Sequence, residues 1–267
     1  MNVIARNFFR LLRAGAFGSN ETIEPMSAWK WMQVYRVAVD QRVASLLYRG
    51  IGRLQEQFFL QIPDAQLDKW QQAVRADKKT GDTAQQLRLT NRWNDQRLNA
   101  IISEATSQSP TLEVLKALLR ATRHMMDDGL YLQPMVEAAN LLRDEKERIN
   151  KEQLAAWGDK LHMTHIAQLE AAMMHKLLGL PAELMPFAML DDEKAVEVMA
   201  DDIFSDRHPQ SGSLHFSQGN DIFVHTSNSK AMLWQAKRSA RFFRYYPSES
   251  ITNLFFAFAK SLTDIEE

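Results

Sequence analysis

The carboxylate side chains of this chain could hold a catalytic metal ion only if several of them converged, and their spacing argues against that. Three pairs of neighbouring aspartates occur, Asp127-Asp128, Asp191-Asp192 and Asp201-Asp202. Neighbours in a helix point about 100° apart, so the two members of a pair cannot face one ion. The chain contains no Asp-x-Asp, and in Gly219-Asn220-Asp221-Ile222-Phe223 a phenylalanine stands where the second acid would be. We interpret the pairs as helix caps and solvated helix faces, and we expect no catalytic magnesium site.

Histidines offer a second kind of candidate site. His162 and His165 are three residues apart and can share a helix face, and His175 follows ten residues later. Two such histidines with a carboxylate could bind zinc. The chain has no His-Glu-x-x-His pattern, and it contains no cysteine to supply a thiolate. The methionine and isoleucine residues around these histidines are typical of a core. We therefore expect neither a metal nor a cofactor.

A run of cations near the C-terminus is the third candidate. The basic residues are interleaved with aromatic ones and comprise Lys230, Lys237, Arg238, Arg241 and Arg244. Cations on one face can neutralise a phosphate backbone while aromatic rings stack on bases. The spacing is also that of an ordinary helix with aromatic residues in the core and cations in solvent. The formal net charge of −1 favours the second interpretation, so we expect no nucleic-acid partner.

Length and composition are those of an ordinary soluble globular protein. The 267 residues include 45% hydrophobic and 24% charged residues, which is sufficient for a full core. The absence of cysteine excludes a disulfide scaffold. We expect no signal peptide at the N-terminus. The densest apolar run, Leu254 to Ala259, is far shorter than the ~20 residues needed to span a bilayer, so we expect a cytoplasmic protein without a membrane partner.

The apolar residues recur at steps of three and four along nearly the whole chain, which predicts an all-α fold. Glycine and proline total only 18 and fall mostly at the ends of these periodic segments, as Gly15 to Gly18 and Pro25 do. We expect a multi-helix, bundle-like single domain over 1–267. The later helices are expected at 111–127, 132–143, 151–157, 159–178, 230–245 and 248–262.

Two segments interrupt the helical pattern. Around 206–229 the helical period is lost, and we expect a short β-hairpin or an irregular loop there. Ser107-Gln108-Ser109-Pro110 breaks the chain between two helical halves, 1–104 and 111–267, which 105–110 joins. Both halves carry apolar faces that need cover, so we expect them to pack against each other.

Packing and turn motifs give the chain a resemblance to a known family. They are Phe8-Phe9-Arg10-Leu11-Leu12-Arg13-Ala14-Gly15, His124, Gly129-Leu130, Pro134 to Leu142 and Leu177-Leu178-Gly179-Leu180-Pro181. The chain resembles a bacterial nucleotidyltransferase family, most of whose members are uncharacterised, over most of 1–104 and 111–260. Members of that family carry a small α/β palm with a Gly-Asp-x-Asp motif that binds magnesium. Here only Ala105 to Pro110 stand where a palm would require on the order of a hundred residues.

The resemblance therefore implies the helical frame of that family without its catalytic palm. Our leading hypothesis is a non-catalytic protein that acts by protein contacts or regulation, through an unknown protein partner or self-association. A small-molecule or nucleotide binding module that uses the groove between the halves is the alternative, and a divergent enzyme with an unrecognised site is a second alternative. The candidate contact residues are His124, Met125, Asp128, Gly129, Lys237 and Arg241.

Among these candidates we expect the site at the seam of the halves rather than on the basic stripe. Removal of a palm would uncover a surface near 105–110 and the 124–129 region, and a soluble chain seldom leaves a large apolar surface bare. Charge introduced by Leu112→Glu or Met125→Glu is expected to disturb assembly or ligand binding there. The same change at Arg241 is expected to have no such effect.

Overall fold

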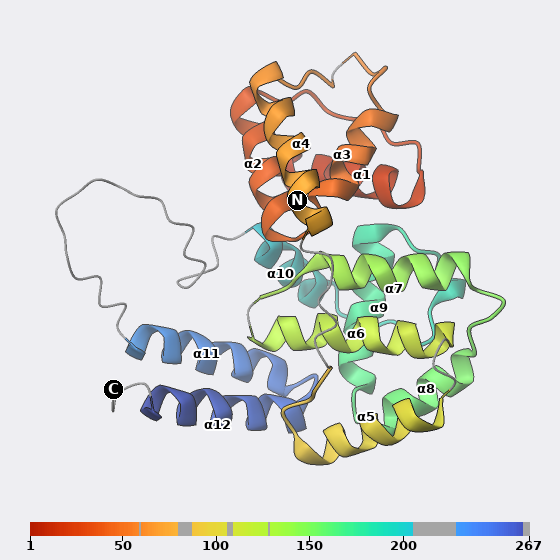
Figure 1. Cartoon of the computed structure of the whole chain (residues 1–267), viewed down its shortest axis with the longest axis vertical. Helices are drawn as coiled ribbons and strands as arrows, with labels where there is room; N and C mark the ends of the chain where they lie inside the picture. The colour runs from red at the N-terminus through yellow and green to blue at the C-terminus, as the bar shows by residue number, and fades with distance from the viewer. Residues whose placement is uncertain (59, 80–86, 106–108, 128, 205–227, 264–267) are drawn as a thin grey trace.

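The structure, a computed structural model, describes residues 1–58, 60–79, 87–105, 109–127, 129–204 and 228–263 (Figure 1). This part of the chain holds twelve α-helices, one short 3₁₀ turn and no strand, which confirms the expected all-α class. No helix in it is long and apolar enough to cross a bilayer. Except for Asn228 and Ser229, which begin a helix, the segment expected to form a hairpin or loop around 206–229 lies outside the described residues.

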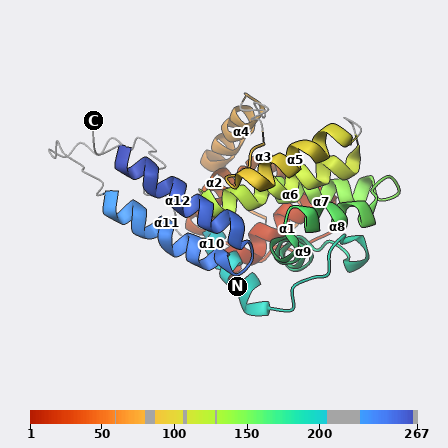
Figure 2. The same ribbon diagram turned by 90° about the horizontal axis from the view of Figure 1, so that it is seen from below.

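Apart from α10, the helices form three spatial groups. The helices are α1 (Val3–Phe17), α2 (Ala28–Asp40), α3 (Ala44–Arg53), α4 (Asp64–Lys79), α5 (Arg92–Glu104), α6 (Pro110–Asp127), α7 (Leu132–Asp144), α8 (Lys151–Lys160), α9 (Thr164–Leu178), α10 (Glu193–Phe204), α11 (Asn228–Phe243) and α12 (Pro247–Thr263). Figure 1 shows α1–α4 together at the top and α5–α9 together below them. In both Figure 1 and Figure 2, α11 and α12 lie side by side and extend away from the other helices.

Two glycines allow α1 and α3 to cross at close range. A Cβ atom added to Gly15 would lie 1.8 Å from the carbonyl oxygen of Leu46, and one added to Gly50 would lie 2.1 Å from that of Leu11. Any side chain at either position would therefore force the two backbones apart. The sequence motif at 8–15 thus ends in a glycine that the packing requires.

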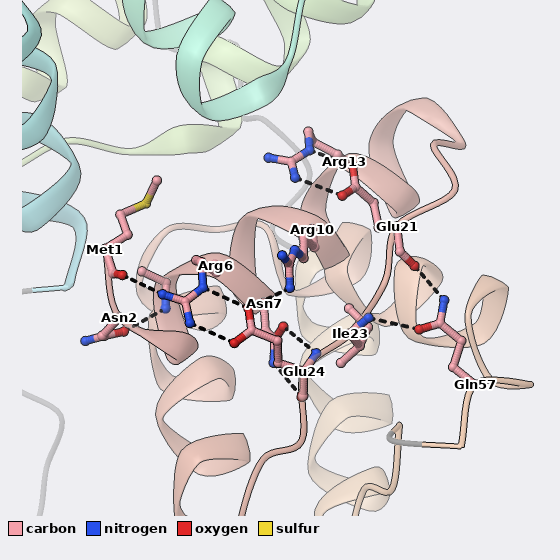
Figure 3. A network of polar contacts seen from close by, with 11 residues as sticks. Met1, Asn2, Arg6, Asn7, Arg10, Arg13, Glu21, Ile23, Glu24 and Gln57 are labelled. Atoms are coloured by element: carbon pink, nitrogen blue, oxygen red, sulfur yellow. Dashed lines mark hydrogen bonds and ion pairs between the residues drawn. The ribbon is translucent and has the colours of Figure 1, made fainter.

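An arginine-rich face of α1 holds the connection between α1 and α2 (Figure 3). Arg6 donates two hydrogen bonds to the carboxylate of Glu24, at 2.8 and 2.7 Å, and Arg10 donates a third at 2.8 Å. Arg13 makes a similar bidentate pair with Glu21. The sequence pattern puts the start of a helical segment at Pro25, whereas α2 begins at Ala28, after the cap Ser27.

The same sharp corner joins α2 to α3 and α8 to α9. Arg42 and His162 occupy the left-handed region of backbone space, with φ of 55° and 56°. Each corner closes with three backbone hydrogen bonds of 2.9 to 3.0 Å in the same pattern, and each is followed by a fully buried residue, Val43 or Met163. The same backbone turn thus occurs twice in the chain, although non-glycine residues seldom adopt the left-handed conformation.

Side chains of α1 and α7 connect the first group of helices to the rest. Arg13 donates to the carbonyl oxygen of Leu177 at 3.1 Å, and Arg143 donates to that of Phe17 at 2.8 Å. The ring of Phe204, at the end of α10, lies edge-on to Phe8 and Phe9 with centroids 5.3 and 6.0 Å away. Helices from the two expected halves therefore pack against each other.

Helix α5 belongs spatially with the C-terminal helices, although it falls within the expected first half. Glu249 of α12 accepts hydrogen bonds from the backbone N–H groups of Thr90 and Asn91 at 2.9 to 3.2 Å, directly before α5. Asn94 of α5 donates to the same carboxylate at 3.1 Å. A carboxylate at a helix N-terminus satisfies N–H groups that have no partner within the helix and complements the helix dipole.

The glycine contact predicts opposite effects at two positions of one helix. Gly50→Ala should destabilise the protein by about 1–3 kcal/mol or more, because its Cβ has no room against α1. Gly52→Ala should stabilise it by up to ~1 kcal/mol, because no atom lies within 4 Å of the added methyl and alanine favours helix. Urea unfolding monitored by circular dichroism measures both, and equal effects at the two positions would contradict the close crossing.

The Glu24 network predicts a loss of stability in acid. Hydrogen bonds from Arg6 lower the pKa of Glu24 from 4.5 to about 2, so its stabilising contribution is present above the ordinary value and is lost as the pH falls toward 2. Glu24→Gln should be less stable than the natural chain at neutral pH, and this difference should shrink at about pH 3. The exposed Glu56, changed to Gln, is the control. A constant difference between pH 7 and 3 would rule out this role for Glu24.

Candidate functional site

A hollow lies at the seam between α1–α4 and the remaining helices, and polar side chains make up most of its lining. Its volume is about 30 Å³, enough for about two or three water molecules. The lining residues come from the α2–α3 corner, from α6 and from the start of α7: Arg42, Arg120, His124, Tyr131, Gln133, Pro134 and Glu137.

The ring of Tyr131 organises one side of this seam hollow. The guanidinium of Arg42 lies over the ring at 4.8 Å from its centroid, and the imidazole of His124 meets the ring edge-on at 4.7 Å. A cation over an aromatic face is attracted by the ring quadrupole, by about 0.5–1 kcal/mol at an exposed position. Arg42 is thereby held over a residue that is distant from it in the sequence.

A carboxylate organises the other side. Glu137 accepts a hydrogen bond from Arg120 at 2.8 Å and another from Gln133 at 3.2 Å, one on each oxygen. The Glu137 carboxylate and the Arg120 guanidinium are therefore fixed relative to α7. The described residues that line the hollow thus include two guanidinium groups and one carboxylate.

The residues expected at the seam have different places in the structure. His124 lines the hollow. Gly129 is buried, has φ of 130° and donates its N–H to the carbonyl oxygen of His124 at 2.8 Å, so it shapes the turn after α6. Asp128 lies outside the described residues. Sequence reasoning missed Arg42, Arg120 and Glu137, because nothing in their local spacing indicates that they meet.

Met125 and Leu112 lie in the core of the protein. Met125 is fully buried and Leu112 is 1% exposed. Substitution of either by glutamate would bury a charge and destabilise the fold, so such variants would not report on a surface contact. The informative positions at this seam are the side chains that line the hollow.

The basic stripe of α11 is largely used inside the fold. The Arg238 guanidinium is buried and donates to the carbonyl oxygen of Met125. Arg241 pairs with Asp202 at 2.8 Å, and Arg244 pairs with Asp192 at 3.0 Å. Lys237 is exposed on the same helix. Asp202 and Asp192, which belong to two of the pairs of neighbouring aspartates, are therefore the partners of two arginines of the basic stripe.

The three histidines considered as metal ligands do not form a cluster. His162 and His165 are exposed, and the Nδ1 atom of His175 lies 2.8 Å from the carbonyl oxygen of Leu180. Across the described residues, no three acidic or imidazole side chains are grouped so that they could hold a metal ion.

A buried carboxyl group lies deeper, between α6 and α9. Glu170 is completely buried, and Thr122 donates a hydrogen bond to its Oε1 atom at 2.8 Å, while its Oε2 atom accepts none from any described residue. Burial raises the pKa of Glu170 well above its ordinary value. Thr122 also lines a second hollow of about 10 Å³, beside Glu249 and Asn253, which has room for one water molecule.

Apolar side chains are exposed on the α11–α12 hairpin. Phe255 and Phe256 are 68% and 66% exposed, and Ile251 and Leu254 on the same helix are also exposed. Phe243, at the end of α11, is half exposed. We call these five residues the α12 face. Large aromatic side chains this exposed are unusual on a surface that nothing covers.

The buried Glu170 carboxyl predicts a stabilising substitution. Because its pKa is raised in the folded state, stability falls as the pH rises from the ordinary value of 4.5 toward the raised pKa. Glu170→Gln should therefore be more stable than the natural chain at pH 8 and lose this advantage near pH 5. Thermal unfolding at both pH values tests it, with the exposed Glu197→Gln as control. A Gln variant that is less stable at pH 8 would contradict it.

Comparison of the chain with models of protein families, with curated proteins and with solved structures finds no match.

Proposed function

We propose that this chain is a non-catalytic relative of the nucleotidyltransferases that acts through protein contacts, and that the partner of its α12 face is a second copy of the same chain. The observation that carries the proposal is the exposure of four apolar side chains, Ile251, Leu254, Phe255 and Phe256, within two turns of α12. Burial of such side chains is the main favourable term in protein association.

The charge of the α12 face favours self-association over a charged partner. From Ser250 to Ala259 the sequence has ten residues and no ionisable group. A neutral apolar face is complementary to another copy of itself, and a two-fold dimer brings the same patch of both subunits together. An acidic or basic partner would find no opposite charge on this stretch of helix.

The geometry of the hairpin supplies a second argument for a dimer. Helices α11 and α12 lie side by side and extend from the body of the molecule (Figure 2). Two such hairpins, packed face to face, would form a four-helix bundle, an arrangement in which each apolar face is covered by the other hairpin. The internal pairs of Arg241 and Arg244 with acids weaken the case for an anionic partner on α11.

The relationship to nucleotidyltransferases rests on the sequence. The motifs at 8–15, 134–142 and 177–181 support it, and the lack of an Asp-x-Asp pair supports a role without nucleotidyl transfer. Incubation with labelled ATP or CTP and Mg²⁺ tests this part separately. Label transfer that Asp221→Ala abolishes would overturn it.

Sedimentation or light scattering at protein concentrations of about 1–100 µM tests the dimer. Dissociation constants in or below this range are typical of interfaces of ordinary size. We expect a dimer for the natural chain and a monomer for the double variant Phe255→Glu, Phe256→Glu, since the introduced charges would have to be buried in the contact. Both positions are exposed in the monomer, so circular dichroism and melting temperature should change little. Trp29→Glu is the matched control, because Trp29 is 64% exposed on α2 and should not affect the mass.

Several results would overturn self-association. A natural chain that is monomeric at the highest concentration excludes a dimer of useful strength. A dimer that survives the double variant has its contact elsewhere. A monomer that binds anionic vesicles through Phe255 and Phe256 would assign the α12 face to a lipid surface instead.

A further inference from the structure

Polar contacts hold the start of α12 to the body of the protein. Helices α11 and α12 pack on each other and on α6, and they extend away from the other helices (Figure 2). The Tyr246 hydroxyl donates to the carbonyl oxygen of Leu161 at 2.8 Å, and Asn253 donates to the carboxylate of Asp127 at 2.8 Å. Between these two contacts lies Glu249, whose carboxylate accepts hydrogen bonds from the N–H groups before α5. The α11–α12 hairpin thus meets three other elements within about two turns of helix.

The buried carboxyl group of Glu170 lies beside this attachment. Thr122 donates to its Oε1 atom at 2.8 Å and also lines the hollow of about 10 Å³ beside Glu249 and Asn253 of α12. Burial, and next the charge of Glu249, raise the pKa of the buried Tyr246 hydroxyl, and the charge of Glu170 adds to this effect. Glu170 of α9 and Glu249 of α12 therefore belong to one buried polar cluster with Thr122 and Tyr246.

The two carboxyl groups of this cluster have unequal surroundings. Glu249 accepts hydrogen bonds from two backbone N–H groups and from Asn94 at the N-terminus of α5, which suits a carboxylate. Glu170 has one hydroxyl donor, and its Oε2 atom has no partner among the described residues. The hydroxyl of Thr122 can donate or accept, so this hydrogen bond survives protonation of Glu170. The surroundings therefore favour a charged Glu249 and a neutral Glu170.

The charged groups around the cluster lie on the side of Glu249. They come from the segment before α5, from α5 and from α6, and comprise Arg88, Asp95, Arg97, Arg123 and Asp127. Burial raises the pKa of Glu249, hydrogen bonds from the N–H groups lower it, and the charge of Asp95 raises it further. Because three donors stabilise its carboxylate, Glu249 is the member of the cluster that can carry a charge inside the fold.

The surroundings of Glu170 give no such support to a charge. Among the described residues, no charged side chain acts on it. Arg13 of α1 and Glu193 of α10 contact α9 about two turns beyond it. Burial raises the pKa of Glu170 well above its ordinary value, and only the Thr122 hydroxyl opposes the rise. A negative charge on Glu170 would therefore be buried with one donor and no cation.

From this arrangement we propose that the α11–α12 hairpin stays docked while Glu170 holds its proton and opens when that proton is lost. An ionised Glu170 needs water or further donors, and the core between α6 and α9 offers neither without an opening. The hairpin extends away from the other helices (Figure 2), so it is the element of the cluster that can open without unfolding the others. Opening moves Tyr246 and Glu249 away from Glu170 and lets water reach its carboxylate.

The direction of the pH effect follows from the raised pKa of Glu170. The docked state binds the proton more tightly than the open state, in which water reaches the carboxyl group and its pKa has the ordinary value of 4.5. Docking is therefore strongest at or below this ordinary value and weakens as the pH rises toward the raised pKa. From Ser250 to Ala259 the chain has no ionisable group, so association through the α12 face would not itself produce this dependence.

Hydrogen exchange of the full-length protein tests the opening, followed by mass spectrometry between about pH 6 and 9 at one protein concentration. Division by the intrinsic exchange rate at each pH gives the protection of each segment. We expect residues 245–253 to be less protected than α1 and α3 at every pH, because the hairpin opens without the rest of the fold. The protection of 245–253 should fall about tenfold or more over this pH range, because opening releases the proton of Glu170.

Three variants separate Glu170 from other causes. In Glu170→Gln the protection of 245–253 should not change with pH, whereas the exposed Glu197→Gln should keep the full fall. Thr122→Val removes the hydroxyl that donates to Glu170, so the pKa of Glu170 should rise further and the fall should extend to higher pH than in the natural chain. Thr122→Val also keeps the test available if Glu170→Gln does not fold.

The proposal fails on any of three results. Equal protection of 245–253, α1 and α3 would mean that the hairpin opens only when the whole chain unfolds. Protection of 245–253 that does not change with pH would mean that opening releases no proton from Glu170. A fall that persists in Glu170→Gln, or that covers the same pH range in Thr122→Val as in the natural chain, would assign the titration to another group.

Discussion

Helix α6 must be covered over more than half of its circumference, because eleven of its residues between Thr111 and Met126 are buried. The residues that are not buried share one narrower side, which carries Arg120 and His124. Helices α7, α8, α9, α11 and α12 all pack against it. The same helix carries Arg120 and His124 into the seam hollow, Thr122 toward Glu170, and the Met125 carbonyl toward Arg238. Each of these polar groups is therefore positioned by α6, which is also a large part of the apolar core.

The two left-handed corners have the same backbone structure and different side chains. Both corners turn the chain between two helices with the same hydrogen bonds, and the residue that follows is buried at each. The backbone cost of positive φ is thus part of the fold at both places. What differs is the side chain, a guanidinium stacked on Tyr131 at one corner and an exposed imidazole at the other.

The elements that the sequence predicted well are those governed by local physics. Apolar periodicity and caps predicted the bounds of α6, α7, α8, α11 and α12 to within about three residues, whereas α9 begins at Thr164 and not at 159, and α10 was not expected. Gly18 ends α1, with φ of 72° and its N–H bonded to the carbonyl oxygen of Ala14. The meetings of Arg42 with Tyr131 and of Arg120 with Glu137 depend on how helices cross, and no local pattern encodes them. The same is true of Arg241 and Arg244, whose partners Asp202 and Asp192 are 39 and 52 residues away. Sequence reasoning identified both of these arginines and both aspartates as charged groups but could not join them.

Apolar residues near the junction, which we expected to need cover, are buried, whereas α12 carries exposed apolar residues. Residues of α6 near the junction, such as Leu112 and Met125, are buried, because the C-terminal hairpin and the neighbouring helices cover them. The hairpin contributes Phe242 and Tyr246 to the core, both fully buried. A helix pair that buries one side in this way still has an opposite side, and on α12 that side carries Phe255 and Phe256. The apolar side chains that are exposed on α12 can be covered only by something outside this chain's described helices.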